Sequence, residues 1–175
     1  MNAGLLPFVP YPLPLRGSDL IRPATPADVP LILQLIRELA EYEKLSHEVR
    51  ATEAQLRATL FVPRPAAEVV IAEDDGEAVG FAVFFASYSN WEAAAGLYLE
   101  DLFVRPAARG KGIGRELLEY LAGLTMARGW ARLEWRVLDW NEPSIAFYRK
   151  VGAEPLEDWT VFRLTGDSLR KLAGS

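Results

Sequence analysis

The sequence predicts an α/β fold in which helices flank both faces of a central twisted, mixed β-sheet. Short apolar segments typical of strands alternate along the chain with segments whose apolar residues recur at helical spacing. Residues 97–118 combine the two patterns, because an apolar, aromatic strand leads into a glycine-rich turn and then into a helix. The chain has 175 residues, half of them apolar and a quarter charged, which suits one globular domain with one core.

The predicted strands are runs rich in apolar, aromatic and β-branched residues, bounded by turn residues. Residues 74–76, Asp-Asp-Gly, are typical of a hairpin turn between two of them. Pro106 ends the strand before the glycine turn, because proline cannot donate a hydrogen bond to a ladder. The predicted strands comprise residues 20–22, 68–73, 78–88, 98–104, 132–138 and 160–164.

The predicted helices begin at capping residues and end at glycine or proline. Thr25 is an N-cap, Pro26 takes the first helical position and Asp28 adds an acid to the first turn. Glycine at the end of a helix permits a left-handed C-cap. The predicted helices extend from residue 25 to about 44, from Thr52 to before Pro63, from the glycine turn to about 128, and from 141 to about 152.

Composition and charge exclude several classes of function. The net charge of −5 argues against a nucleic-acid partner, which needs a basic face. The chain has no cysteine, which excludes disulfides and a thiolate nucleophile, and a single histidine, so no metal site is expected. No apolar run is long enough to span a bilayer, and we expect no membrane partner.

Residues 1–18 are expected to form an extended arm, followed by a single domain over residues 19–175. Prolines at positions 7, 10, 12 and 14 space this arm, and no basic residues flank its start. It therefore lacks the pattern of a signal peptide. The default expectation is a cytoplasmic protein.

The glycine turn at residues 109–114 predicts a phosphate site. Glycines allow positive φ and close approach of a ligand to backbone N–H groups, and the first N–H groups of the following helix carry the positive end of its dipole. The turn is not a P-loop, because Lys111 is followed by Gly112, nor a dinucleotide fingerprint, because Leu117 stands where the third glycine belongs. The alternative is a turn that only connects a strand to a helix.

The segment Arg109-x-x-Gly112-x-Gly114, with a strand before it, resembles the acetyl-coenzyme A signature of the GNAT N-acetyltransferases. The order of predicted elements from Leu20 onward is similar to the GNAT fold. Residues 21–25, 98–104 and 140–148 look like the diamine (spermidine/spermine) acetyltransferase branch. The resemblance implies acetyl-CoA as co-substrate, a small amine as acceptor and a homodimer that shares elements near the C-terminal strand. The arm at residues 1–18 lies outside the family pattern.

The hypothesis for the cofactor is that N–H groups of the glycine turn hold the pyrophosphate, with added charge from Arg109, Lys111 and Arg115. The resemblance implies that the strand before the turn pairs with the pantetheine arm and polarises the acetyl carbonyl. It also places Asn141 on the coenzyme, although Asn141 equally fits a helix N-cap. The expected cofactor-binding residues are Leu102, Phe103, Val104, Arg109, Gly110, Lys111, Gly112, Ile113, Gly114, Arg115, Asn141 and Tyr148.

Tyr148 is the candidate general acid. When the tetrahedral intermediate collapses, coenzyme A leaves as a thiolate, and a phenol within hydrogen-bond reach can protonate it. The pattern of Phe147 and Tyr148 ahead of Gly152 matches the family and favours this role. The alternative is a core tyrosine on an amphipathic helix.

Glu100 and Asp101 are adjacent acids in an apolar strand, where an unpartnered carboxylate is costly. Alternation puts them on opposite faces of the sheet unless a bulge turns the strand. We expect Glu100 to act as base, through one water, or as an amine anchor, and Asp101 to be structural or a second anchor. The alternative is that each carboxylate is tied to a neighbouring arginine or backbone N–H.

A primary amine is mostly ammonium at pH 7, so an acceptor site needs acids that attract it. The resemblance adds Glu43, with Tyr42 beside it, although Glu43 also fits a solvated helix end. Trp140 can offer a cation–π face, although tryptophan is more often a core residue. The expected substrate-binding residues are Tyr42, Glu43, Glu100, Asp101 and Trp140.

Two alternatives to a diamine or lysine-like acceptor remain open. The first is a GNAT enzyme with another acceptor, such as an amino acid, a protein N-terminus or an antibiotic amine, which the fold alone cannot separate. The second is a non-catalytic acetyl-CoA sensor. The joint presence of Tyr148 and Glu100 favours an enzyme.

Overall fold

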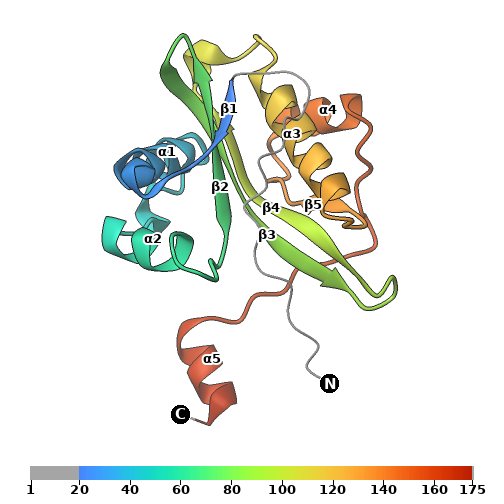
Figure 1. The fold of residues 1–175 in the computed structure, drawn as a ribbon. Helices are drawn as coiled ribbons and strands as arrows, with labels where there is room; N and C mark the ends of the chain where they lie inside the picture. Colours follow the sequence, from blue (N-terminus) through green and yellow to red (C-terminus); the bar gives the residue numbers. More distant parts are fainter. Residues whose placement is uncertain (1–19, 175) are drawn as a thin grey trace, which may run out of the picture. The chain divides into compact units, whose positions relative to one another are not determined.

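The computed structural model describes residues 20–174 (Figure 1). The chain divides after Arg136 into two compact units, residues 1–136 and 137–175. The expected arm at residues 1–18 lies outside the described residues. The single domain expected over residues 19–175 stays a prediction.

The β-sheet belongs to the first unit and has five strands in the order β1-β2-β3-β4-β5. The first four pair antiparallel in chain order, whereas β5 lies parallel to β4. The predicted mixed sheet is therefore confirmed. The strands are β1 (Ile21–Pro23), β2 (Glu68–Asp74), β3 (Glu77–Ser89), β4 (Ala94–Val104) and β5 (Leu133–Trp135).

Three α-helices of the first unit lie on the two faces of this sheet (Figure 1). α1 (Val29–Tyr42) and α2 (Glu53–Leu60) lie on one face, and α3 (Ile113–Ala127) lies on the other. The predicted flanking of both faces is confirmed. Among residues 20–174, no helix combines the length and the apolar character that crossing a membrane requires.

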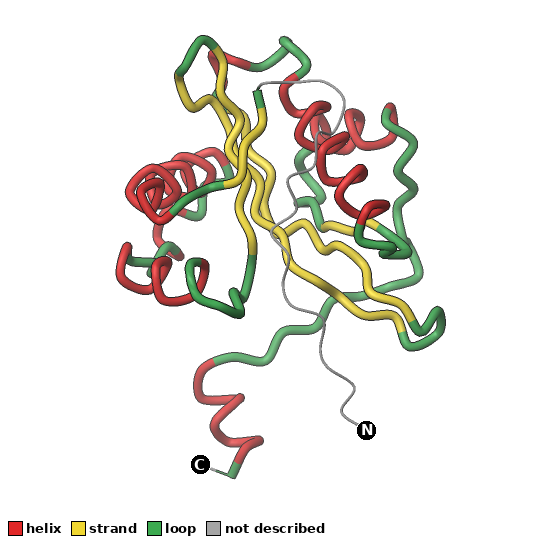
Figure 2. The backbone as a smooth tube through the Cα atoms, in the orientation of Figure 1, coloured by secondary structure: helices red, strands yellow, loops and turns green. Residues whose placement is uncertain are grey.

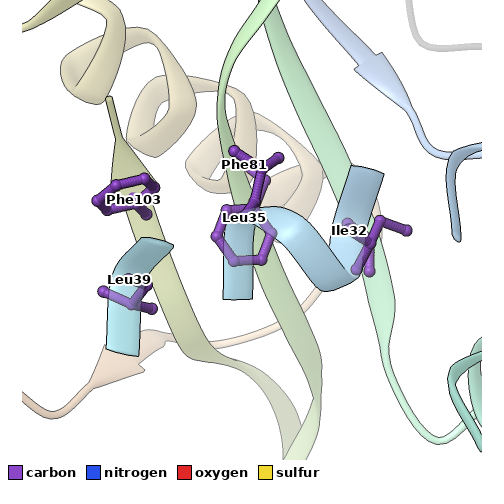
Figure 3. Packing of buried hydrophobic residues seen from close by; sticks show 6 residues of the cluster. Ile32, Leu35, Leu39, Phe81 and Phe103 are labelled. Carbon is purple, nitrogen blue, oxygen red and sulfur yellow. The ribbon is translucent and has the colours of Figure 1, made fainter. Parts of the chain in front are cut away.

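The core between α1 and the sheet fixes the position of the end of α1. Figure 3 shows Ile32, Leu35 and Leu39 of α1 gathered with Phe81 of β3 and Phe103 of β4, and all five side chains are buried. Burying a side chain of this size contributes about 1.5–3 kcal/mol. The last turn of α1 is thus held near the C-terminal half of β4.

Thr25 is an N-cap as predicted, but it caps a short 3-10 helix at Pro26–Asp28, and α1 begins only after it, at Val29. The backbone N–H and the hydroxyl of Thr25 donate to the Asp28 carboxylate at 2.7 and 2.8 Å. Arg22 donates to Asp28 at 2.8 Å and to Glu73 of β2 at 2.7 Å. The Arg22 guanidinium lowers the pKa of Asp28, so this carboxylate stays ionised and ties the helix start to β1 and β2.

A β-bulge interrupts β4 at Glu100. Leu99 pairs with Phe84 and Asp101 pairs with Val83, which leaves Glu100 as an extra residue. Since directly opposed residues share a face, the odd-numbered residues of β4 change face at this point. Leu99 therefore lies on the face opposite α1, whereas Asp101 lies on the α1 face, where Phe103 packs in the core.

The predicted strand at residues 160–164, in the second unit, does not form. This segment has no regular structure and leads into α5 (Gly166–Ala173), a helix that the sequence did not indicate (Figure 2). The apolar side chains of residues 160–164 are exposed, and Phe162 is 91% exposed. A strand needs a neighbouring strand with which to form hydrogen bonds. The described part of the second unit contains only the helices α4 (Glu142–Lys150) and α5, so it offers no such neighbour.

Two strands also differ from prediction by more than one residue at an end. β4 begins at Ala94, within the predicted loop 89–96, because Ala94 pairs with Ser89 across the hairpin. β5 covers only Leu133–Trp135 instead of residues 132–138.

Candidate active site

The glycine turn joins β4 to α3 in the predicted order of strand, turn and helix. Gly110 has φ of 80° and Gly112 has φ of 91°, a left-handed conformation that side-chain-bearing residues rarely adopt. The N–H groups of Arg115 and Glu116 both donate to the Gly112 carbonyl, at 2.9 and 3.1 Å. The N–H groups before them lie at the positive end of α3, where an anion is stabilised.

The basic side chains of the turn have protein partners. Arg109 Nε donates to the Val104 carbonyl at 2.9 Å. Lys111 Nζ lies 2.7 Å from an Asp74 carboxylate oxygen, and Arg115 Nε lies 2.8 Å from Glu119. The turn therefore offers backbone N–H groups, and each of its three cations uses only part of its donors in these contacts, which leaves other N–H groups able to bind a phosphate.

Arg109 links the turn to the end of α1. Its guanidinium carbon lies 4.4 Å from the centre of the Tyr42 ring and 5.8 Å from that of Phe103. Tyr42 is the last residue of α1 and Glu43 is its C-cap, whose N–H donates to the Leu39 carbonyl at 2.9 Å. The expected coenzyme turn and the expected amine site are thus joined through one stacked side chain.

Three of the predicted acids come together in the first unit. Asp101 is largely buried, and its pKa is raised to about 6, first by burial and then by the negative charges of Glu100 and Glu43. Burial also raises the pKa of Glu43. Neither carboxylate shows the strong arginine pair that lowers the pKa of Asp28. The site is consequently rich in negative charge that a bound cation would relieve.

Glu100 differs from Asp101 in exposure and in partner. As the bulge residue, its side chain is 46% exposed, and its Oε2 lies 3.9 Å from Arg136 Nη2. The Arg136 guanidinium carbon lies 5.7 Å from the centre of the Tyr98 ring. Arg136 is not among the predicted site residues, although an arginine directly after a strand that ends in tryptophan is a signal for a charged group at the strand end.

Three predicted site residues lie in the second unit. Asn141 is buried and is the N-cap of α4, where its Oδ1 accepts from the N–H of Ser144 at 3.4 Å. The rings of Phe147 and Tyr148 lie 5.4 Å apart on this helix. Trp140 is half-exposed. The alternative role of Asn141 as a helix cap is therefore present in the structure.

Residues 20–174 contain no group of three or more histidine, aspartate or glutamate side chains arranged to hold a metal ion. The polar groups described above in the first unit are carboxylates, backbone N–H groups, guanidinium groups and the Lys111 ammonium. These suit a substrate cation and a coenzyme anion.

The model of the Acetyltransferase (GNAT) family matches residues 31–153, which is more than half of the chain. The chain belongs to the GNAT acetyltransferase family. It is therefore an acyltransferase, and GNAT acetyltransferases use acetyl-CoA as co-substrate. The expected family and enzyme class are confirmed.

Two relatives indicate the branch of the GNAT family to which this enzyme is similar. It is 40% identical over 166 residues to a thialysine N-epsilon-acetyltransferase of Bos taurus, covering 89% of this chain and 97% of that protein. It is 34% identical over 163 residues to a spermidine/spermine N(1)-acetyltransferase-like protein of Homo sapiens, covering 87% of this chain and 23% of that protein. Both are consistent with the diamine branch.

Among solved structures, an integron cassette protein from the mobile metagenome of V. cholerae has a TM-score of 0.74 and 26% identity. The match covers 91% of this chain and all of the other. The mixed sheet with helices on both faces is thus shared with a known structure.

Proposed function

We propose that this GNAT enzyme transfers the acetyl group of acetyl-CoA directly to the primary amine of a small cationic acceptor, a diamine, polyamine or lysine-like amine. The observation that carries the proposal is the meeting of three carboxylates around Asp101, whose pKa is raised by burial and by the nearby charges of Glu100 and Glu43. A bound ammonium relieves that repulsion. The acceptors named for the two relatives, thialysine and spermidine or spermine, carry such amines.

Within this site we assign Asp101 to the reacting end of the acceptor. Its pKa of about 6 suits a carboxylate that is ionised at pH 7 and can still take a proton. Glu100 and Glu43 then act as anchors for the cation. This assignment shifts the role of base, expected for Glu100, toward the more buried neighbour.

For the coenzyme, the free N–H groups at the start of α3 are the proposed pyrophosphate seat. The left-handed glycines Gly110 and Gly112 and the bonds at the Gly112 carbonyl support this. We propose that residues 102–104 at the end of β4 contact the pantetheine arm and that Asn141 contributes from the N-cap of α4. These roles follow the family pattern.

The proposed reaction forms a C–N bond and breaks a C–S bond, while the nitrogen loses a proton and the sulfur gains one. The neutral amine nitrogen attacks the acetyl carbon, the carbonyl oxygen becomes an oxyanion, and a backbone N–H of β4 stabilises it. The C–S bond then breaks, and the amine keeps the acetyl group. The proton lost by the nitrogen passes to a carboxylate or water, and Tyr148 protonates the departing thiolate.

The test is acceptor-dependent release of coenzyme A thiol, measured with a panel of amines. The panel contains diamines, polyamines, lysine-like amino acids, an N-terminal peptide and an aminoglycoside. Release with the first three groups supports the proposal. Release only with the peptide or the aminoglycoside supports another GNAT acceptor, and acetyl-CoA binding without release supports a sensor.

We also propose that the enzyme is a homodimer. The C-terminal segment exposes Trp159, Phe162 and Leu172 at 68%, 91% and 78%, and such apolar area is typical of a protein interface. Light scattering should give twice the chain mass, and deletion of residues 156–175 should shift it toward monomer. A monomer for the full chain would contradict the proposal.

The cytoplasmic location stays a prediction.

A further inference from the structure

Arg136 brings a positive charge to the edge of the acidic site. It directly follows β5, whose Trp135 pairs with Leu99 of β4, so Arg136 stands beside the bulge residue Glu100. Its Nη2 lies 3.9 Å from Glu100 Oε2, and its guanidinium carbon lies over the Tyr98 ring at 5.7 Å. The side chains of Arg136 and Glu100 are 45% and 46% exposed, so a ligand can reach both.

We propose that Arg136 and Glu100 together bind the α-carboxylate and α-ammonium of an amino-acid acceptor, so that the enzyme prefers a diamino acid to the diamine that lacks its carboxylate. This proposal rests on the proposed function, because it names the acceptor class of the same site. Arg136 is thereby a specificity-determining residue.

The geometry of the ion pair leaves room for a ligand. A separation of 3.9 Å exceeds the 2.7–3.2 Å of a hydrogen bond, so Glu100 does not occupy the guanidinium donors. A guanidinium presents its N–H groups as a planar fork that fits a carboxylate. The Glu100 oxygens accept hydrogen bonds from an ammonium.

The charge pattern favours a zwitterion over a polyamine. A polyamine is positive at every amine at pH 7, and Arg136 would repel the end that lies nearest to it. The head of an amino acid carries one charge of each sign, which matches one arginine and one glutamate. Asp101 and Glu43 then remain for the ammonium of the side chain.

The test compares two acceptors that differ only in the carboxylate, L-ornithine and 1,4-diaminobutane, in the wild type and in Arg136→Gln. We expect the wild type to have the higher kcat/KM for ornithine. Arg136→Gln should lower kcat/KM for ornithine at least about tenfold, mainly through KM, because hydrogen bonds between charged groups are the strong ones. The same variant should leave kcat/KM for the diamine unchanged or raise it.

Arg132→Gln is the matched control, because Arg132 precedes β5, pairs with Glu134 at 2.8 Å and has a side chain 36% exposed. It should leave the ratio of the two acceptors unchanged. Equal losses for both acceptors in Arg136→Gln, or none for ornithine, would overturn the inference while the proposed function stands. If the wild type acetylates neither acceptor, nor any lysine-like amine or polyamine, the proposed function fails first.

Discussion

The carboxylate of Glu43, at the end of α1, lies close enough to Asp101 in β4 for its charge to raise the pKa of Asp101. Burial contributes more to this shift, and Glu100 adds to it. The bulge at Glu100 is what puts Asp101 on the α1 face. A buried Asp101 carboxylate whose charge is disfavoured by two neighbouring carboxylates costs stability, and its position is explained if the site exists to hold a cation.

Asp101→Asn should stabilise the free protein at neutral pH. The pKa of Asp101 is about 6 when folded and 3.8 as its ordinary value, so the folded state holds the proton more tightly. Its contribution to the free energy of unfolding therefore falls as pH rises from about 4 to about 6. The variant should gain up to about 3 kcal/mol at pH 7 and little at pH 4.

Urea unfolding at several pH values measures this difference. Asp158→Asn, at an exposed aspartate, is the control and should show no such trend. A difference between wild type and Asp101→Asn that stays flat between pH 4 and pH 7 would contradict the assignment of the buried carboxylate.

The same titration should appear in catalysis. If the ionised Asp101 holds the ammonium or takes its proton, kcat/KM for the amine rises as pH increases through about 6. The limb near pH 6 should disappear in Asp101→Asn, and the remaining rise at higher pH should follow the acceptor amine. Steady-state kinetics from pH 5 to 9 measure both. An unchanged limb in the variant would assign the titration to another group.

Gly112→Ala should weaken acetyl-CoA binding. Open space surrounds the position of a Cβ at Gly112, so the change acts through its φ of 91°, which costs a side-chain-bearing residue roughly 1–2 kcal/mol. The turn then relaxes and its N–H groups no longer converge on one anion. Calorimetry should show at least about tenfold weaker binding, since 1.4 kcal/mol is tenfold in affinity.

Gly76→Ala is the matched control for this change. Gly76 has φ of 78° in the β2–β3 hairpin and open space around its Cβ position as well. It should lose similar stability without losing affinity for acetyl-CoA. Equal affinity losses in the two variants would show that the effect is general strain instead of a local anion seat.

Tyr148→Phe should lower kcat more than it changes the affinity for acetyl-CoA. The variant keeps the ring beside Phe147, which lies 5.4 Å away, and removes only the proton that the thiolate would receive. We expect a loss of about 10²–10⁴-fold in kcat, the usual size of a general-acid effect. Tyr88→Phe, at an exposed tyrosine of β3, serves as control. Unchanged turnover in Tyr148→Phe would remove the role.

Local signals in the sequence predicted most of the first unit. The capping set of Thr25 and Asp28, the hairpin at residues 74–76 and the strand-turn-helix around Gly112 all depend on neighbouring residues, and each forms as expected. The same is true of the end of α3, where Gly129 has φ of 66°. Elements whose cause lies within a few residues are those a sequence specifies most directly.

The features that could not be predicted from the sequence depend on contacts between residues that are distant along the chain. The bulge at Glu100 is a matter of register against β3, and only the register shows that Asp101 faces Glu43. The predicted strand at residues 160–164 had the apolar pattern but lacks a neighbouring ladder within the described residues. Arg136 could be recognised as a candidate site residue only from the pairing of β5 with β4, which brings it beside Glu100.

Titration of the purified protein with acetyl-CoA, followed by calorimetry, tests the central claim most directly. The account predicts saturable binding that free coenzyme A competes away and that Gly112→Ala weakens. Binding should precede thiol release on addition of a small amine. Absence of binding heat and of competition by coenzyme A, with a protein that unfolds cooperatively, would contradict the claim that the turn between β4 and α3 holds the coenzyme.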